Sequence, residues 1–197
     1  FQIKKIGIDL KHFDIGGGIG VQYNNEKIFS IQDFAEALLP KFKKLNCNIF
    51  FEPGRFLTAN GGILVTKVLF TKKNKDKNFI IVDAAMNDIL RPSIYKAYHH
   101  IQPVKLNLNE KDIEADIVGP VCESSDFLAK NRLIQSCHQN DFLSVMSAGA
   151  YGMVMASNYN SRRRPAEVMV DGSNFKIIRK RETFEDLIDD EENLLYW

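Results

Sequence analysis

The sequence predicts an α+β protein in which a parallel β/α segment is followed by a largely β module. Before Asn60, a short apolar strand, a glycine-rich loop, an amphipathic helix and a second strand follow one another. After Gly62 the pattern changes to short runs rich in Val, Ile and Phe that are separated by turn residues. We therefore expect two domains, one at 1–60 and one at 61–197, the second of them ending in a helix.

The first domain is expected to contain two strands joined by a helix. Residues 11–15 and 47–51 are the apolar runs that predict the strands. Ser30 is predicted to cap the helix, because Asp33 completes a variant of the capping box and apolar residues then recur at spacings of three and four. Pro40 lies inside this pattern and should kink the helix or end it. The loops after both strands would lie at the same edge, where β/α folds gather their chemistry.

The predicted strands of the second domain are short and closely spaced. They cover residues 63–71, 79–83, 104–108, 115–118, 142–148, 167–170 and 175–178. The lysine-rich stretch 72–77 is typical of a solvated turn. Thr183 should begin the last helix, whose apolar face is formed by Phe184, Leu187, Ile188, Leu194 and Leu195.

Composition narrows the class of protein. The chain has 197 residues, of which 45% are hydrophobic and 26% charged, so it is long enough to bury a core and is not biased toward disorder. A formal net charge of +1 gives no indication of a nucleic-acid or membrane partner. We find neither an apolar run long enough to span a bilayer nor a basic-then-apolar leader, and we expect a soluble, cytoplasmic protein. Because the chain begins at Phe1 and leads directly into a strand, we also expect a fragment of a longer protein.

The sequence predicts no metal site. The three cysteines, an odd number without Cys-x-x-Cys spacing, argue against both a disulfide framework and a zinc site. His99 and His100 are adjacent, so on a helix or a strand their side chains point in different directions.

Two loops that follow the predicted strands carry groups suited to an anion. The glycines at 16–18 allow positive φ angles and expose backbone N–H groups that suit a phosphate, although a glycine turn at a strand end also occurs without a ligand. In the turn at 52–55, the carboxylate of Glu52 can bond a protonated heterocyclic nitrogen and Arg55 can hold a phosphate or carboxylate with two hydrogen bonds. The alternative for this turn is a surface salt bridge.

A third loop joins a thiol to carboxylates. Cys122 and Glu123 follow the short apolar segment 117–121, and this composition is reactive rather than suited to packing. Arg91 and Tyr95 are four residues apart and can share a helix face, where the alternative is an exposed pair that packs on its own helix. The small neighbours of Tyr151 leave its ring room to meet a planar ligand, although an ordinary buried tyrosine would have the same surroundings.

In combination, these segments resemble a known enzyme family. The segments at 14–20, 51–62, 82–100, 118–126 and 141–172 are similar, in this order, to the carboxyl-terminal part of the diaminopimelate decarboxylases. These belong to the fold-type III family of pyridoxal-phosphate-dependent decarboxylases, which also acts on ornithine, lysine and arginine. Ornithine decarboxylases usually have Asp after the Cys and lack the Arg-Pro-x-x-Tyr segment, so Glu123, Arg91 and Tyr95 favour the diaminopimelate branch.

The resemblance implies the last β/α units of a pyridoxal-phosphate-binding (β/α)8 barrel, followed by a carboxyl-terminal β-barrel or sandwich domain. It also implies pyridoxal 5'-phosphate as cofactor, with Glu52 facing the pyridine nitrogen. The implied cofactor-binding residues are Gly17, Gly18, Glu52, Pro53, Gly54, Arg55 and Tyr151. The implied substrate-binding residues are Arg55, Arg91, Tyr95, Glu123 and Tyr151, the arginines suiting the distal carboxylate and Glu123 the distal ammonium.

By resemblance, Cys122 is the catalytic proton donor, contributed across the interface of a homodimer with shared active sites. The implied reaction is the decarboxylation of meso-diaminopimelate to L-lysine, the last step of lysine biosynthesis. The Schiff-base lysine of the family precedes the matching region, so we expect the chain to be inactive alone. Two alternatives stay open: a decarboxylase for another basic amino acid of the ornithine or arginine type, and a non-catalytic truncated homologue.

Overall fold

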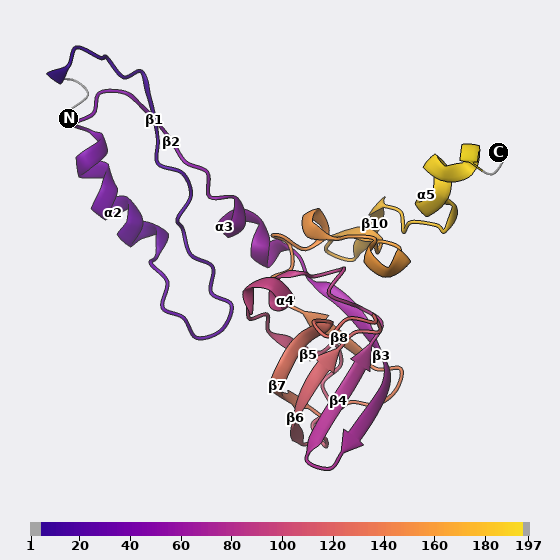
Figure 1. Ribbon diagram of the computed structural model, residues 1–197. Helices are drawn as coiled ribbons and strands as arrows, with labels where there is room; N and C mark the ends of the chain where they lie inside the picture. The colour runs from indigo at the N-terminus through magenta and orange to yellow at the C-terminus, as the bar shows by residue number, and fades with distance from the viewer. Residues whose placement is uncertain (1–4, 195–197) are drawn as a thin grey trace.

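The structure is a computed structural model that describes residues 5–194 of the chain. Figure 1 shows an amino-terminal arm that contains β1, α2 and β2, a curved sheet built from β3 to β8, and a carboxyl-terminal segment with β10 and α5. The arm and the carboxyl-terminal helix α5 both project from the sheet and lie far apart (Figure 1). No helix within residues 5–194 combines the length and the apolar character needed to cross a membrane.

The arm has the predicted strand–helix–strand order. Strands β1 (His12–Asp14) and β2 (Asn48–Phe50) pair in parallel, and α2 (Ile31–Phe42) connects them. The capping box is confirmed, because the Ser30 side chain accepts from the Asp33 N–H while the Asp33 carboxylate accepts from the Ser30 N–H. Pro40 does not end the helix, which continues to Phe42, so of the two expected effects the break is wrong and the kink stays a prediction. Pro40 lies in the last turn, so its missing N–H removes one hydrogen bond close to where the helix ends.

The apolar face of α2 is largely uncovered. Phe34 and Phe42 meet the ring of Phe51 edge-on, with ring centres 6.0 and 5.9 Å apart. A groove of about 240 Å³ remains between the helix and Phe51. No residue of α2 is buried, although its apolar residues repeat at helical spacing. Such a face is typical of a helix that packs against another structural layer.

A short helical connection leads from the arm to the sheet. Helix α3 (Gly54–Thr58) follows β2 after three residues, so the arm and this connection form two successive β/α units. A turn of 3-10 helix (Ala59–Gly61) precedes the first strand of the sheet. The division into domains at residue 60 stays a prediction.

Six strands form the sheet, in the order β5-β8-β3-β4-β6-β7. They are β3 (Leu64–Asn74), β4 (Lys77–Val82), β5 (Ile101–Pro103), β6 (Asp112–Val118), β7 (Phe127–Gln135) and β8 (Phe142–Val145). Neighbouring strands are antiparallel except β4 and β6, which are parallel. The strands at the two ends of this order, β5 and β7, contact each other, so the sheet curls almost into a closed barrel.

The hydrophobic core lies inside this curled sheet. Its largest fully buried apolar side chains are Ile80, Ile89, Ile101, Ile117, Leu128 and Leu143. Five of these residues lie in the strands β4 to β8, and Ile89 lies in the segment before α4 (Arg91–Tyr95). The packed core therefore holds this segment, as well as the strands, in place.

One predicted strand is absent, and two observed strands were not predicted. Residues 104–108 are not a strand: Val104 donates its N–H to the Phe142 carbonyl at 2.8 Å, and β8 begins at Phe142, so no partner strand extends alongside the residues that follow. The alternating apolar residues of this stretch are exposed instead, with Leu108 at 94%. Conversely, β5 and β7 were not predicted: β5 has only three residues, and polar residues at 130–132 interrupt the apolar pattern of β7. Pairing with β6 determines this strand.

The carboxyl-terminal segment contains a hairpin and short helices. Strands β9 (Glu167–Asp171) and β10 (Asn174–Arg179) pair antiparallel, as the apolar runs at 167–170 and 175–178 predict. Helix α5 (Glu185–Ile188) is followed by 3-10 helix (Asp189–Leu194), with Thr183 Oγ accepting from the Asp186 N–H at 3.1 Å. The predicted apolar face of this helix includes Leu195, which lies outside the described residues.

Candidate functional site

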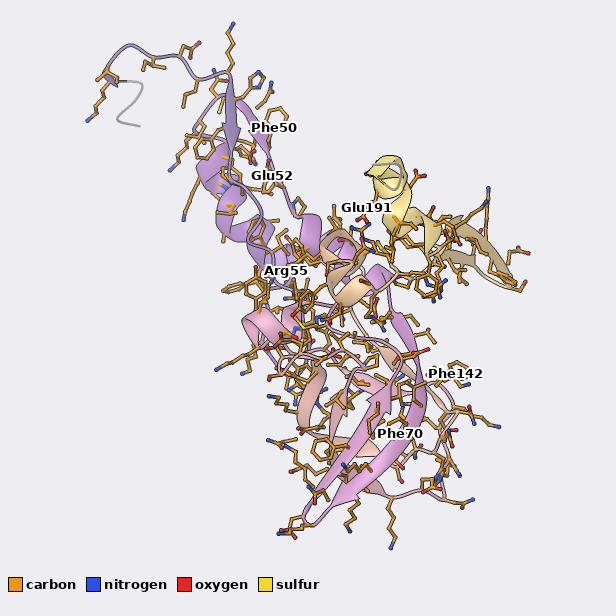
Figure 2. The ribbon with its side chains drawn as sticks, turned by 45° about the vertical axis from the view of Figure 1, so that its right-hand side comes forward. Phe50, Glu52, Arg55, Phe70, Phe142 and Glu191 are labelled. Atoms are coloured by element: carbon orange, nitrogen blue, oxygen red, sulfur yellow. The ribbon has the colours of Figure 1, made fainter. Side chains whose placement is uncertain are left out.

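The glycine loop and the Glu52 turn meet at the carboxyl ends of β1 and β2. Glu52 donates its N–H to the Gly16 carbonyl at 2.8 Å. A Cβ atom on Gly17 would lie 2.7 Å from the Glu52 carbonyl oxygen, so only glycine permits this approach. Gly18 has a φ of 86° and open space where a Cβ would be. Figure 2 shows Phe50, Glu52 and Arg55 following one another from the arm toward the sheet.

This junction offers unused hydrogen-bond donors. The Gly16 N–H bonds the Asp14 carboxylate at 2.7 Å and the Gly54 N–H bonds the Glu52 carbonyl at 2.9 Å. The N–H groups of Gly17 and Gly18 have no partner among residues 5–194. Two neighbouring free N–H groups beside a glycine bend are a suitable cradle for a phosphate.

Most of the predicted polar site residues are exposed and unpaired. Within the described part of the chain, no hydrogen bond or ion pair joins another residue to the side chains of Glu52, Arg55, Tyr95, Cys122 and Tyr151. Tyr151 has a φ of 62°, a conformation that a bulky residue rarely adopts outside a constrained site.

The segment that carries Tyr151 packs against the end of α3. Gly149 donates its N–H to the Ala59 carbonyl at 3.0 Å, and Ala148 donates to the Gly62 carbonyl at 2.8 Å. Ala59 and Ala150 are both buried in a small cluster with Val21. Arg55 and Tyr151 therefore belong to chain segments that are tied to each other, and both segments contact the chain that follows the glycine loop.

Arg91 is buried, whereas Tyr95 in the same helix is 65% exposed. The Arg91 guanidinium donates to His99 Nε2 at 2.9 Å, and its carbon lies 4.8 Å from the ring centre of Tyr23. No carboxylate in the described residues pairs with it. A buried guanidinium without a counter-charge is uncommon, and it favours an anionic ligand at this position.

The loop that carries Cys122 is fixed by Asp126. The buried Asp126 carboxylate accepts from the Val121 N–H and from the Met86 N–H, each at 2.7 Å. This arrangement leaves the Cys122 thiol exposed. Cys137 differs, because it lies in the core, where burial raises the pKa of its thiol to about 11. Of these two cysteines, only Cys122 is placed to meet a ligand.

The Glu123 carboxylate is held from two sides by neutral donors. One oxygen accepts from the Ser125 N–H at 3.1 Å and the other accepts from the Tyr159 hydroxyl at 3.2 Å. Tyr159 is in turn held by Asn87, whose side chain donates to the Tyr159 carbonyl at 2.8 Å. No cation among residues 5–194 pairs with Glu123, so the carboxylate is oriented and free to bind one.

The predicted site residues therefore form two groups. The first group comprises the glycine loop, the 52–55 turn and Tyr151. Tyr23 connects this group to Arg91, because it packs beside Ala59 and Ala150 and its ring lies against the Arg91 guanidinium. The second is the loop at 122–126, which contacts α4 through a hydrogen bond of 2.6 Å from the Ser93 hydroxyl to the Ser125 carbonyl. In the described chain no interaction joins the side chains of Cys122 or Glu123 to Glu52 or Arg55.

Sequence reasoning missed three residues of this region, Tyr23, His99 and Tyr159. Their contacts with Arg91 and Glu123 join residues far apart in the chain, so no local pattern reveals them. Arg91 and His99 are close in the sequence, but their spacing does not predict that the two side chains are in contact. Within residues 5–194, no group of His, Cys, Asp and Glu side chains has the arrangement of a metal site.

The fold defines the class of protein: a curled mixed sheet that follows a parallel β/α segment, with a glycine-rich loop at the strand ends of that segment. Residues 21–149 match the family model described as pyridoxal-dependent decarboxylase, C-terminal sheet domain. The chain belongs to this family of pyridoxal-dependent decarboxylases.

Diaminopimelate decarboxylases are among the proteins that resemble the chain. It is 49% identical over 184 residues to the diaminopimelate decarboxylase of Aquifex aeolicus, covering 93% of this chain and 44% of that protein. The corresponding enzyme of Neisseria meningitidis is 49% identical over 179 residues, covering 91% of this chain and 44% of that protein. The crystal structure of Helicobacter pylori diaminopimelate decarboxylase complexed with L-lysine matches with a TM-score of 0.90 and 44% identity, over 98% of this chain and 47% of that chain. The chain thus spans less than half the length of these relatives.

Proposed function

We propose that this chain is the carboxyl-terminal part of a diaminopimelate decarboxylase, which releases carbon dioxide from meso-diaminopimelate and forms L-lysine. One observation carries the substrate assignment: buried Arg91 has no carboxylate partner in the described chain, and the oriented Glu123 carboxylate has no cation partner. Diaminopimelate has both a carboxylate and an ammonium group at its distal end, and it complements these two charges. The names of the relatives support the same reaction.

Pyridoxal 5'-phosphate fits the junction between the glycine loop and the Glu52 turn. The free N–H groups of Gly17 and Gly18 suit its phosphate, and Gly54 and Arg55 lie in the adjoining turn, where Pro53 immediately precedes the helix that carries Arg55. The unpaired Glu52 carboxylate suits a protonated ring nitrogen. When bound, the cofactor supplies an electron-withdrawing ring that stabilises the negative charge left by departing carbon dioxide. We assign no lysine of this chain to its covalent attachment.

The substrate would be bound by residues from both groups. Arg55 and Arg91 suit its carboxylates, Glu123 suits its distal ammonium, and the exposed phenols of Tyr95 and Tyr151 offer further hydrogen bonds. Ornithine and lysine lack the distal carboxylate, so they would leave the Arg91 guanidinium buried and unpaired. A site of this kind discriminates against them through the free energy lost by that unpaired charge.

Cys122 is the residue we assign as proton donor. Its Sγ–H would supply the proton that takes the place of the lost carboxylate on the α-carbon, and its exposed position at the end of a fixed loop suits this role. Since Cys122 and Glu123 do not contact the Glu52–Arg55 turn in the described chain, we assign them to the site of a second subunit in a homodimer.

The arm belongs in our proposal to a (β/α)8 barrel. Its parallel strands, the absence of buried residues in α2 and the apolar groove beside that helix all fit a β/α unit whose neighbouring units are not in this chain. The sheet that follows is the carboxyl-terminal β domain of the family.

A chimeric enzyme tests the proposed function. In it, this chain replaces the matching segment of the Aquifex aeolicus relative, whose remaining residues supply the other part of the protein. We expect the chimeric enzyme to bind pyridoxal phosphate and to release carbon dioxide from meso-diaminopimelate with L-lysine as product, while ornithine and arginine react poorly. The parent enzyme is the control. A chimeric enzyme that contains the cofactor but acts on ornithine or arginine in preference to diaminopimelate would contradict the proposal.

The shared site is tested by mixing subunits. Chimeric enzymes with Cys122→Ala and with Arg55→Ala should each be nearly inactive as homodimers. After subunit exchange, heterodimers contain one site in which both residues are intact, so part of the activity should return. If exchange is demonstrated by mass spectrometry and no activity returns, each site is built from one subunit.

A further inference from the structure

The buried Arg91 guanidinium depends on His99 for its only side-chain hydrogen bond in the described chain. His99 has no exposed surface, and its Nε2 lies 2.9 Å from Arg91 Nη1. Its other ring nitrogen, Nδ1, lies 2.9 Å from the Met146 carbonyl oxygen. His99 thus connects α4 to the end of β8 through both of its nitrogens.

These two contacts determine the protonation of the ring. The Met146 carbonyl can only accept, so Nδ1 must carry a proton. Arg91 can only donate, so Nε2 must be without a proton. A single neutral tautomer satisfies both partners, whereas a doubly protonated ring would turn an N–H group toward the Arg91 guanidinium.

The surroundings of His99 favour the neutral ring. The charged groups that face it are Arg91 from α4 and Arg132 from β7, whose guanidinium donates to the His99 carbonyl at 2.7 Å. The Tyr23 ring packs edge-on against His99, with centres 5.3 Å apart. No carboxylate is among these neighbours. Burial lowers the pKa of His99, and the two guanidinium groups lower it further, against the opposing effect of the Met146 carbonyl.

Tyr23 contributes a second contact to the same guanidinium. Its ring centre lies 4.8 Å from the Arg91 guanidinium carbon, which is within the range of a cation–π interaction. The Tyr23 hydroxyl is buried and has no hydrogen-bond partner in the described residues, so the ring face is the part of Tyr23 that acts on Arg91. Tyr23 also packs beside Ala59 and Ala150, next to the segments that carry Arg55 and Tyr151.

We propose that His99, as the neutral tautomer protonated at Nδ1, is a positioning residue that, with the ring of Tyr23, orients Arg91 toward the substrate carboxylate. This inference rests on the proposed function for the identity of the substrate. The geometry gives His99 no contact with substrate of its own: it acts by holding a guanidinium that would otherwise be buried without an acceptor.

Two substitutions separate the two roles of the ring. His99→Gln places an amide oxygen near the position of Nε2 and keeps an acceptor for Arg91, but loses the bond to Met146. His99→Asn places an amide N–H near the position of Nδ1 and keeps the bond to Met146, but leaves Arg91 without an acceptor. A purely structural role of His99 predicts similar losses in both variants. His100→Gln is the matched control, because His100 is exposed.

In the chimeric enzyme we expect His99→Asn to raise KM for diaminopimelate by about tenfold or more, the effect of losing one hydrogen bond to a charged group. We expect the KM of His99→Gln to stay within about threefold of the KM of the unsubstituted chimeric enzyme. A threefold change corresponds to less than half of the free energy of a tenfold change. kcat should change less than KM in both variants if ground-state binding is affected. Equal losses in the two variants, or a smaller KM effect in His99→Asn, would overturn the positioning role.

A measurement without substrate tests the tautomer. In the ¹⁵N-labelled 197-residue chain, long-range ¹H–¹⁵N correlation should show His99 protonated at Nδ1 and bare at Nε2 between about pH 6 and 8, the range in which an ordinary histidine titrates. A ring protonated at Nε2 would overturn the inference. A wild-type chimera that is inactive on diaminopimelate would instead refute the proposed function, and with it the substrate part of this inference, while the tautomer is decided separately by the spectrum.

Discussion

The junction between the end of α3 and the segment before Tyr151 provides the sharpest test of the architecture. Gly62 has an extended backbone, with φ −138° and ψ 148°, so alanine is allowed there on conformational grounds. Space is the obstacle, because a Cβ on Gly62 would lie 2.7 Å from Gly149 Cα and 2.9 Å from Gly149 N. Gly62→Ala must therefore push these two backbone segments apart.

The magnitude follows from what lies across this contact. Moving Gly149 Cα to an ordinary contact distance requires a shift of at least about 0.7 Å, which places the clash among the overpacked sites that cost about 1–3 kcal/mol. The same shift strains the hydrogen bonds from Ala148 to Gly62 and from Gly149 to Ala59, each worth about 0.5–1.5 kcal/mol. Alanine also reduces the entropy of the unfolded chain and returns about 0.4–1 kcal/mol. We expect a net loss of about 1–5 kcal/mol in the free energy of unfolding.

Urea unfolding of the 197-residue chain measures this change, with Gly61→Ala as the matched control. A Cβ on Gly61 meets nothing within 4 Å, so that variant gains the entropic benefit without the clash. In the chimeric enzyme, Gly62→Ala should also lower kcat/KM, because the displaced segments carry Arg55 and Tyr151. Ordinary surface substitutions change the free energy of unfolding by about 0.5 kcal/mol or less. If Gly62→Ala and Gly61→Ala differ by no more than this, the close approach of Gly62 to Gly149 does not exclude a larger residue, and our reasoning is wrong.

Three further predictions concern the site. Cys122→Ala in the chimeric enzyme should leave the Kd for diaminopimelate unchanged and lower kcat by about a hundredfold or more, because the proton donor acts only after binding. An unchanged kcat refutes the acid role. Glu123→Gln keeps both hydrogen bonds of the side chain possible but removes its charge, so KM for diaminopimelate should rise by about tenfold, and an unchanged KM would exclude Glu123 from ammonium binding. The lowered pKa of His99 means that its stabilising contribution is fully present above its ordinary value of 6.5 and is lost as the pH falls through its folded-state pKa. The free energy of unfolding of the wild-type chain should therefore fall more on acidification than that of His99→Gln, and identical slopes against pH would contradict this. The hydrogen bond with Glu110 raises the pKa of His138, so His138 has the opposite pH dependence. Both proteins contain His138, and its effect cancels in the comparison.

The sequence by itself determined the features that depend on neighbouring residues. Ser30 and Asp33 form the capping box because the two groups are three positions apart on one turn. The order of β1, α2 and β2 and the glycine bend at 16–18 follow in the same way, from local backbone preference and hydrophobic period. The turn expected at 72–77 is shorter than predicted, because β3 continues to Asn74 and β4 begins at Lys77. The resemblance of these segments to a decarboxylase family was likewise available, since it depends on residues in order along the chain.

Tertiary structure alone decided what depends on distant partners. Strand β7 exists because β6 supplies its hydrogen bonds, whereas residues 104–108 are not a strand because β8 pairs no further than its first residue, Phe142, which bonds only Val104 of this stretch. Arg91 was visible as a cation, but its burial beside His99 and Tyr23 required the glycine-loop segment to fold against α4. The support of Glu123 by Tyr159 is of the same kind. Whether a side chain is buried or held by a hydrogen bond depends on which segments meet in space, and the residues adjacent to it in sequence do not carry that information.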